Sequence, residues 1–358
     1  MTLLGLAAPL CVYAVVTALH LALPARRVAG YVTDPATGQP LRYRLNGLLV
    51  FLVTLALWAF ACWRGWLAWD GLWQVRWASL AGACALGLVL TLALVLPAPG
   101  TGKGLLADLF LGRLMNPRIL GGRLDLKMWL YMVGATMLGL NLYSFAAHHL
   151  LAFPRDPSPG VLLYTGLFSF FLVEYLFFER VHLYTYDLFA ERVGFKLGWG
   201  CLVFYPYFYP VGLWSTAALP NPHSPPWLLA LAAIVFFAGW SLARGANMQK
   251  YVFKRDPTAR FLGIAPEALV DGEHRLLVSG FWGVARHVNY LGEVLMASGL
   301  ALSLGYPTHI GPWLYPLYYV ALLVPRQIDD DRRCRAKYGP LWDAYRARVR
   351  WRIAPGLF

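Results

Sequence analysis

Charged residues are scarce in this sequence, and acidic ones are the scarcest. Only 14% of the 358 residues are charged, with 18 Asp and Glu against 31 Lys and Arg, whereas 59% are hydrophobic. Soluble globular domains carry about 25% charged residues, so the composition excludes an ordinary soluble globule. Internal repeats, low-complexity tracts and long linkers are also lacking, and we predict a single integral membrane domain over residues 1–358.

Cysteine is sparse as well. The five cysteines lie far apart, without a C-x-x-C pair, and four of them fall in apolar runs. This pattern predicts free thiols, with neither a disulfide nor a metal site. The cysteines are Cys11, Cys62, Cys84, Cys201 and Cys334.

The sequence is rich in long apolar runs. Most of them have about the 20 residues that a helix needs to cross a bilayer. They predict an all-α polytopic membrane protein with about nine to ten transmembrane helices. The first run lacks the basic start and the A-x-A site of a signal peptide, so we count it as a span. The predicted spans are Leu3–Leu23, Leu45–Cys62, Trp77–Leu96, Met128–Leu151, Val161–Phe178, Leu197–Leu213, Trp227–Leu242, His287–Leu304 and Ile310–Val324.

The distribution of Lys and Arg predicts the orientation of this bundle in the membrane. With nine spans, 28 of the 31 cationic residues fall in alternate loops, and Arg64, Arg76 and Arg155 fall on the other side. By the positive-inside rule, the 28 face the cytoplasm, so the C-terminus is inside and the N-terminus outside. The net charge of +13 then reflects orientation and anionic lipid headgroups, and it requires no nucleic-acid partner.

Three segments on the cytoplasmic side are rich in specific polar groups. The first, Gly104–Lys127, has the sequence GLLADLFLGRLMNPRILGGRLDLK, with turns expected at Asn116-Pro117 and Gly121-Gly122. From composition alone we predict an interfacial loop whose cations contact lipid phosphates, and a functional loop stays open as the alternative. These cations are Arg113, Arg118, Arg123 and Lys127.

The second segment, Leu276–Glu293, has the sequence LLVSGFWGVARHVNYLGE. If a helix begins just before Arg286, four polar residues share one face, and such groups at membrane depth should line a cavity or pair with each other. We predict a ligand site here, with Arg286 and Glu293 as an ion pair that holds the face. Gly280 and Gly283 would let a ligand or another backbone approach closely. The four polar residues are Arg286, Asn289, Tyr290 and Glu293.

The third segment, Arg326–Phe358, has the sequence RQIDDDRRCRAKYGPLWDAYRARVRWRIAPGLF. Gly339-Pro340 should separate two short helices. Two hypotheses stay open for the dense charges: a salt-bridged interfacial tail, or an anion site for a phosphorylated cofactor from the cytosol. The basic run Asn247–Pro257, NMQKYVFKRDP, could join the same surface.

Together these segments resemble the membrane sterol reductases, which reduce sterol C14, C7 and C24(28) double bonds. The second segment is similar to the C-terminal signature of that family, the first to its other signature, and the third to its carboxyl end. A fourth stretch, Tyr186–Tyr209 (YDLFAERVGFKLGWGCLVFYPYFY), is similar to a middle segment. The resemblance covers residues 98–358 in pieces and implies a catalytic core there, with NADPH and sterol pockets. Residues 1–97 would form an N-terminal three-helix part.

The resemblance implies an NADPH-dependent oxidoreductase in a bacterial inner membrane or endoplasmic reticulum, with a cofactor pocket on the cytoplasmic side. A sterol would arrive from the bilayer and NADPH from the cytosol, and the expected double bond is C14, followed by C7. The implied cofactor contacts are Lys250, Lys254 (where the family usually has Arg), Leu277, Trp282, Asn289, Tyr290, Asp330, Cys334, Arg335, Ala336, Lys337, Tyr338 and Tyr345. Candidates for the proton donor or its relay are Tyr209, Glu191, Asp187, Asp330 and Tyr345.

Two other hypotheses belong to different functional classes. RHVNYLGE and KYGPLWDAYRARV also resemble the end of isoprenylcysteine carboxyl methyltransferases, which use S-adenosylmethionine. That family favours Pro where this chain has Val288, and a Glu pair where it has Asp329–Asp331. The remaining hypothesis is a non-catalytic sterol-binding membrane protein, and the retained polar face argues against it.

Overall fold

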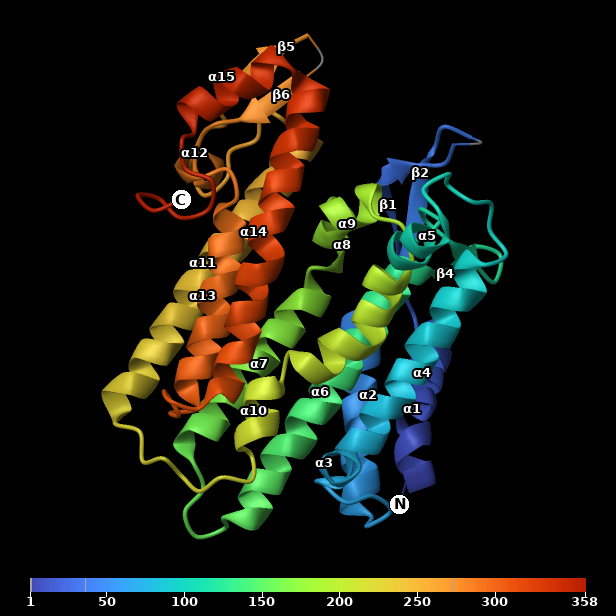
Figure 1. The fold of residues 1–358 in the computed structure, drawn as a ribbon, viewed down its shortest axis with the longest axis vertical. Helices are drawn as coiled ribbons and strands as arrows, with labels where there is room; N and C mark the ends of the chain where they lie inside the picture. Colours follow the sequence, from blue (N-terminus) through green and yellow to red (C-terminus); the bar gives the residue numbers. More distant parts are fainter. Residues whose placement is uncertain (1, 36, 273) are drawn as a thin grey trace. The chain divides into compact units, whose positions relative to one another are not determined.

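A computed structural model describes residues 2–35, 37–272 and 274–358 (Figure 1). The chain forms two compact units, Met1–Asn221 (unit 1) and Pro222–Phe358 (unit 2). Unit 1 contains α1 (Thr2–Ala22), β1 (Arg26–Thr33), β2 (Pro40–Leu45), α2 (Gly47–Trp63), α3 (Gly71–Gln74), α4 (Arg76–Val95), α5 (Leu105–Leu111), β3 (Arg118–Ile119), β4 (Leu124–Asp125), α6 (Leu126–Ala152), α7 (Pro159–Phe177), α8 (Glu179–His182), α9 (Tyr186–Ala190), the π-helix η1 (Phe195–Phe208) and α10 (Val211–Thr216). Unit 2 contains α11 (Pro226–Arg255), β5 (Ala268–Asp271), β6 (His274–Leu277), α12 (Phe281–Val284), α13 (Val288–Ser303), α14 (Ile310–Tyr338) and α15 (Pro340–Arg348).

The core of unit 1 surrounds α6, which packs against α1, α7 and η1. A helix that is apolar on every side belongs in the interior, and most of α6 is buried. Asp125 caps its N-terminus by accepting a hydrogen bond from the backbone N–H of Met128 at 3.2 Å. Further along, the Asn141 amide donates to the carbonyl oxygen of Pro206 in η1 at 2.9 Å. These bonds fix α6 at one end and join it to η1.

In unit 2, α13 packs along α11, and α14 packs along α13. The approach of α11 and α13 depends on glycine, because a Cβ at Gly292 would lie 2.4 Å from the backbone nitrogen of Ala243. The predicted break at Gly339 is confirmed, since α14 ends at Tyr338 and α15 begins at Pro340. The expectation of two short helices was wrong for the first, because α14 continues for 29 residues from the last apolar run.

Within the described residues, three two-stranded antiparallel hairpins, β1–β2, β3–β4 and β5–β6, accompany the helices. The all-α prediction missed these hairpins, because their strands are short and lie in the loops between apolar runs. In β5–β6, Ala268 pairs with Leu277 and Asp271 with His274. Hairpins of this kind satisfy the backbone hydrogen bonds of a loop locally, without a larger sheet.

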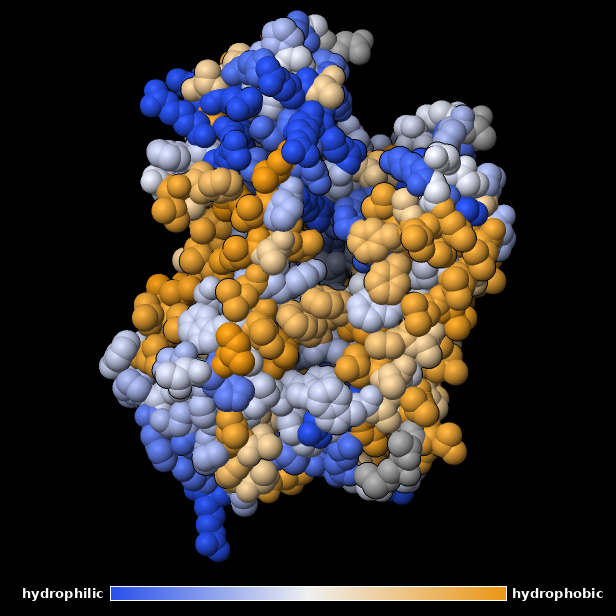
Figure 2. All heavy atoms as spheres, in the orientation of Figure 1, coloured by the Kyte–Doolittle hydropathy of each residue, from blue (hydrophilic) through white to orange (hydrophobic). Residues whose placement is uncertain are grey.

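Each predicted span coincides with helical structure, and the Leu197–Leu213 run forms η1 and the start of α10. Among the described residues, five helices are long and apolar enough to cross a membrane. They are Leu3–Ala22, Arg76–Val95, Leu126–Ala152, Pro159–Phe177 and Pro226–Arg255. Hydrophobic side chains cover the helical part of each unit in Figure 2, and hydrophilic ones gather where α15 and β5–β6 lie. The chain is therefore an integral membrane protein.

Candidate functional site

The predicted site residues divide between the two units. All the implied cofactor contacts lie in unit 2, together with the candidate acids Asp330 and Tyr345. The other candidate acids, Asp187, Glu191 and Tyr209, lie in unit 1.

Trp282 lies at the centre of the unit 2 group. Its indole N–H donates to the carbonyl oxygen of Ala246 in α11 at 2.8 Å. The ammonium group of Lys250 lies 4.9 Å from the centroid of its ring, within the range of a cation–π contact. The hydroxyl of Tyr345 donates to the backbone carbonyl of Trp282 at 3.4 Å. Three residues that were predicted to contact the cofactor, Lys250, Trp282 and Tyr345, therefore lie together.

The glycines beside Trp282 serve close approach by protein atoms. Gly280 has φ of 60°, and a Cβ there would lie 2.3 Å from the amide nitrogen of Gln249. A Cβ at Gly283 would lie 2.5 Å from the carbonyl oxygen of Val278. The predicted close approach of another backbone is confirmed at Gly283, whereas the group that approaches Gly280 is the Gln249 side chain.

Arg286 does not share a helix face with Asn289. Ala285 is extended and α13 begins only at Val288, because the backbone N–H groups of Arg286 and His287 bond to the carbonyls of Trp351 and Arg352. This backbone pairing ties the segment to the carboxyl tail and keeps it out of the helix.

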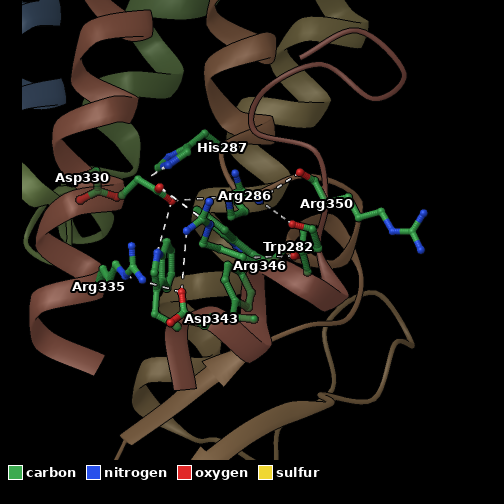
Figure 3. Close-up of polar contacts among 12 residues, drawn as sticks. Trp282, Arg286, His287, Asp330, Arg335, Asp343, Arg346 and Arg350 are labelled. Atoms are coloured by element: carbon green, nitrogen blue, oxygen red, sulfur yellow. Dashed lines mark hydrogen bonds and ion pairs between the residues drawn. The ribbon is translucent and has the colours of Figure 1, made fainter. Parts of the chain in front are cut away.

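The prediction of an ion pair between Arg286 and Glu293 was wrong, because Arg286 lies outside α13. The Arg286 guanidinium, only 4% exposed, donates to the carbonyl of Val349 at 2.8 Å and to that of Arg350 at 3.0 Å (Figure 3). Its acidic neighbour is Asp331 on α14, at 3.8 Å. Arg286 therefore holds the carboxyl tail rather than a helix face.

Asp331 links α14 to α15. One of its oxygens accepts a hydrogen bond from the indole of Trp342 at 3.2 Å, and the other lies 3.9 Å from the Arg346 guanidinium. Asp343 in turn lies 3.7 Å from both Arg335 and Arg346 (Figure 3). The carboxyl segment is thus a folded, salt-bridged structure around the predicted site.

Polar groups at the start of α13 face the acidic residues of α14. The imidazole of His287 lies 3.8 Å from the Asp330 carboxylate, and Figure 3 shows Asp330 directed toward it. The ring of Tyr290 stacks on His287, with centroids 4.8 Å apart. Asn289 makes one long hydrogen bond, 3.5 Å to the side chain of Asn247. Predicted contacts from α13 and α14 are therefore brought together by way of His287.

Burial changes the acidity of several groups in this region. It raises the pKa of Asp330, against the opposing effect of Lys250 and Arg326, and it raises the pKa of Tyr345. Burial raises the pKa of the Cys334 thiol to about 12, so Cys334 stays a neutral thiol.

The remaining predicted contacts surround this centre. Leu277 is buried at the end of β6, and Tyr338 continues the aromatic stack that Trp342 and Tyr345 form. Lys254 lies within electrostatic range of Lys250 and Lys337. The α14 side chains Arg335, Ala336 and Lys337 are exposed. This surface offers cations at its exposed end and apolar walls within.

A dinucleotide cofactor fits these residues. Among the described residues, the imidazole Nε2 of His287 and the amide oxygen of Asn289 are buried without a hydrogen-bond partner. Buried polar atoms are nearly always paired, so these two atoms are available to hydrogen-bond to a ligand. Lys250, Lys254 and Lys337 would supply positive charge for its phosphates.

In unit 1, Asp187 belongs to a polar cluster. The hydroxyl of Tyr131 donates to its carboxylate at 3.3 Å. The ammonium group of Lys127, wholly buried, donates to the carbonyls of Asp187, Leu188 and Glu191 at 2.9, 3.0 and 2.5 Å. Lys127 therefore closes the C-terminal end of α9, where cations are stabilising.

Glu191 and Tyr209 have different surroundings. The Glu191 carboxylate is engaged in an ion pair with Lys196 at 2.7 Å. Tyr209 follows η1, and its ring packs edge-on against Tyr205 at 4.7 Å. Tyr205 packs against Tyr175, which also contacts Tyr131 and lies 4.2 Å from the His182 ring. An aromatic chain thus joins Tyr209 to the cluster around Asp187.

The prediction that the cations of the Gly104–Lys127 loop contact lipid phosphates was wrong for Lys127 and Arg113. Lys127 is buried as described, and Arg113 pairs with Asp108 at 2.8 Å and donates to the carbonyls of Val95 and Ala98. Arg118 lies 3.4 Å from Asp125 and donates to the carbonyl of Arg42, whereas Arg123 is exposed. This loop folds back onto unit 1.

Sequence patterns missed several residues of these clusters. Tyr131 and Tyr175 lie inside apolar runs, where a single tyrosine gives no periodic signal. Lys127 had a usable signal, because a cation directly before a long apolar run must find acceptors or solvent. Asp331 is one of three consecutive aspartates, and the sequence does not show which of their side chains points toward α15.

Comparisons with known proteins cover nearly the whole chain. The sequence profile of the ergosterol biosynthesis ERG4/ERG24 family matches residues 7–358. The chain is 31% identical over 348 residues to the Delta(14)-sterol reductase of Arabidopsis thaliana, covering 94% of this chain and 91% of that protein. It is 32% identical over 349 residues to the Delta(14)-sterol reductase of Methylotuvimicrobium alcaliphilum, covering 90% and 76%. The protein of that name from Ascobolus immersus is 31% identical over 369 residues, covering 97% and 83%.

Proposed function

Because this chain belongs to the ergosterol biosynthesis ERG4/ERG24 family, we propose that it is an NADPH-dependent sterol reductase that saturates the C14 double bond. The observation that carries the proposal is the similarity over nearly the full chain to proteins named Delta(14)-sterol reductase from a plant, a bacterium and a fungus. These relatives favour a sterol reductase over a methyltransferase or a non-catalytic sterol-binding protein. They also favour C14 over C7.

The reaction requires a proton and a hydride in sequence. An isolated carbon–carbon double bond is not polarised, so protonation must first create a tertiary carbocation on the sterol. NADPH, when bound, supplies the hydride that quenches this cation. The protein must hold an acid at the double bond and exclude water from the cation.

Unit 2 is suited to binding the cofactor. The cations Lys250, Lys254, Arg335 and Lys337 suit the pyrophosphate and the extra phosphate that distinguishes NADPH from NADH. Asn289 offers an unpaired amide oxygen to the ligand, and Trp282 offers a ring already held by Ala246. In this proposal seven further residues line the cofactor pocket: Asp330, Cys334, Tyr338, Tyr345, Leu277, Tyr290 and Ala336.

The proton has candidate donors in each unit. In unit 1, Asp187 and Tyr131 form a carboxylate–phenol pair in which the phenol donates and the carboxylate accepts. A relay of this kind lets a tyrosine donate a proton and recover it from the acid. Tyr209 is joined to the pair by aromatic contacts, whereas Glu191 is engaged with Lys196. In unit 2, the raised pKa of Asp330 favours its neutral, proton-donating form.

We also propose an orientation for the protein. The segregation of Lys and Arg supports a cytoplasmic C-terminus, in a bacterial inner membrane or an endoplasmic reticulum. NADPH would then reach unit 2 from the cytosol, and the sterol would enter from the bilayer.

The test is turnover by purified protein in detergent. Sterols unsaturated at C14, C7 or C24 are incubated with NADPH that carries deuterium at the transferable position, and products are analysed by mass spectrometry. The expected result is one deuterium in the product of the C14 substrate, with much slower turnover on NADH. Deuterium transfer to the C7 substrate alone would reassign the double bond. If no sterol in the panel receives deuterium, or if the protein binds S-adenosylmethionine, the reductase assignment is refuted.

A further inference from the structure

Unit 2 contains two buried glutamines with opposite surroundings. Gln249 on α11 is 3% exposed, and both ends of its amide are used. Its nitrogen donates to the carbonyl of Ser279 at 3.1 Å, and its oxygen accepts from the backbone N–H of Phe281 at 3.0 Å. Gln249 is therefore a structural residue that fixes the entrance to α12.

Gln327 on α14 is the contrasting case. Its side chain is 0% exposed, yet neither its amide nitrogen nor its amide oxygen has a partner among the described residues. A buried amide without partners loses its hydrogen bonds to water and gains none, which is costly. A fully buried helix position would ordinarily carry an apolar residue such as Leu. An amide there indicates a partner outside the polypeptide.

The position of Gln327 along α14 suggests which partner. Toward the start of the helix, Leu323 and Tyr319 lie on the same face, and both are buried and uncharged. Toward its end, the same face carries Asp331 and Cys334, which are more exposed. Gln327 therefore lies where the apolar part of the face meets its polar part.

Other unpaired groups lie close to this boundary. The unpaired imidazole nitrogen of His287 lies 3.8 Å from Asp330, the residue three positions after Gln327. The unpaired amide oxygen of Asn289 lies two residues after His287, in the first turn of α13. Because α13 packs on α14, the unpaired groups of His287, Asn289 and Gln327 lie at or on two helices that contact each other.

We propose that Gln327 is a cofactor-positioning residue whose side-chain amide pairs with the carboxamide of the nicotinamide ring. The proposal rests on the proposed function, since it requires a nicotinamide dinucleotide in unit 2. Such a cofactor has highly charged phosphates and one neutral primary amide. The exposed cations Arg335 and Lys337 suit the phosphates, which leaves the carboxamide for the buried, uncharged end of the face. One amide donates while accepting from the other, so the pair satisfies both atoms of Gln327.

Binding measurements on the full-length protein in detergent test this pairing. Wild type and Gln327→Leu are titrated calorimetrically with NADP⁺ and with 2′,5′-ADP, which keeps the adenine end and lacks the nicotinamide. The variant should bind NADP⁺ roughly 10-fold more weakly, the scale of one or two lost hydrogen bonds. Its affinity for 2′,5′-ADP should stay at the wild-type value. Unchanged NADP⁺ affinity, or an equal loss for both probes, would overturn the proposal.

A cofactor analogue separates the carboxamide from the rest of the ring. In 3-acetylpyridine NADP⁺ an acetyl group replaces the carboxamide and removes its donor. Wild type should bind this analogue more weakly than NADP⁺, and Gln327→Leu should discriminate less between the two. If wild type binds neither NADP⁺ nor 2′,5′-ADP, the proposed function fails together with the pairing. If both bind but Gln327→Leu discriminates as wild type does, only the pairing fails.

The matched control is Gln249→Leu, measured by thermal unfolding without cofactor. Gln249→Leu breaks two bonds within the protein and should lower the unfolding temperature. Gln327→Leu removes an unpaired amide and should leave that temperature unchanged or raise it. A fall in Gln327→Leu comparable to that of Gln249→Leu would show that the protein itself pairs the Gln327 amide, and the proposal would be wrong.

Discussion

The guanidinium of Arg286 donates a hydrogen bond to the backbone carbonyl of Val349 at 2.8 Å. This bond joins the segment before α13 to the segment after α15, and the backbone of Arg286 adds a second bond, to Trp351 at 2.9 Å. Both partners lie in the carboxyl tail. The tail is therefore part of the structure that presents the predicted cofactor contacts.

Replacing Arg286 with Ala should destabilise unit 2. The substitution leaves the buried Val349 carbonyl and the partly buried Arg350 carbonyl unpaired and removes the cation beside Asp331, so we expect a loss of about 3 kcal/mol. Thermal unfolding in detergent measures the effect. Arg348→Ala is the control, because its pair with Glu267 is 61% and 62% exposed and should contribute less than about 1 kcal/mol. Equal losses in the two variants would contradict the importance of the tail contact.

Removing residues 339–358 should abolish NADPH binding. This deletion ends the chain after α14, and it removes Tyr345 together with the carbonyls that hold Arg286 and His287. A cut before Arg326 is less informative, because it divides α14 itself. The protein should remain in the membrane fraction and monodisperse, since the five long apolar helices are intact. Normal NADPH affinity in the shortened protein would show that α15 and the tail are dispensable.

Asn289→Ala should weaken NADPH binding while leaving stability nearly unchanged. The buried amide oxygen has no partner among the described residues, and the amide nitrogen makes only a 3.5 Å contact. We expect a loss of about 1–3 kcal/mol of binding free energy, the cost of one unsatisfied polar group. Ser298→Ala on the same helix is the control, because its hydroxyl bonds within α13 to the carbonyl of Val294. Wild-type affinity in Asn289→Ala would remove Asn289 from the site.

Lys127→Met should destabilise α9 and displace Asp187. The ammonium group is buried and holds three carbonyls at the end of α9, so the loss should be about 3 kcal/mol or more. Lys196→Met is the control, because Lys196 is 39% exposed in its pair with Glu191. If Asp187 takes part in proton transfer, kcat should fall more than KM rises in Lys127→Met. A fall in stability with unchanged kcat would assign Lys127 a structural role alone.

Glu179 should make stability depend on pH. Its carboxylate accepts from the backbone N–H of Gly47 through both oxygens at 3.0 Å, and burial raises its pKa from 4.5 to about 7. The folded state therefore binds more protons than the unfolded state between pH 4.5 and 7. The free energy of unfolding should fall as pH rises through that window, by about 3 kcal/mol, and show no further contribution from Glu179 above it.

The variant Glu179→Gln isolates this contribution. Gln keeps an acceptor for the Gly47 N–H but does not titrate. The difference in unfolding free energy between variant and wild type should therefore change across the window and become constant above pH 7. A difference that is the same at pH 5 and pH 8 would contradict the raised pKa.

The membrane character, the helical runs and the family follow from the amino-acid sequence alone. Apolar runs of bilayer length give the same result wherever they pack, because the requirement for internal hydrogen bonding in lipid is local. The Gly339 break was equally local, since glycine and proline end a helix through their own backbone chemistry.

Which polar residues contact one another depends on the tertiary structure. Helical spacing predicted Arg286 on the same helix face as Glu293, but a backbone pairing with the tail more than 60 residues away keeps Arg286 out of the helix. Lys127 and Arg123 look alike in a basic loop, yet one is buried on carbonyls and the other is exposed. Gln249 and Gln327 each lie in a charged stretch in the C-terminal part of a long helix, and only their neighbours distinguish a paired amide from an unpaired one. Hydrogen-bond partners far apart in the chain are set by packing, which local pattern does not encode.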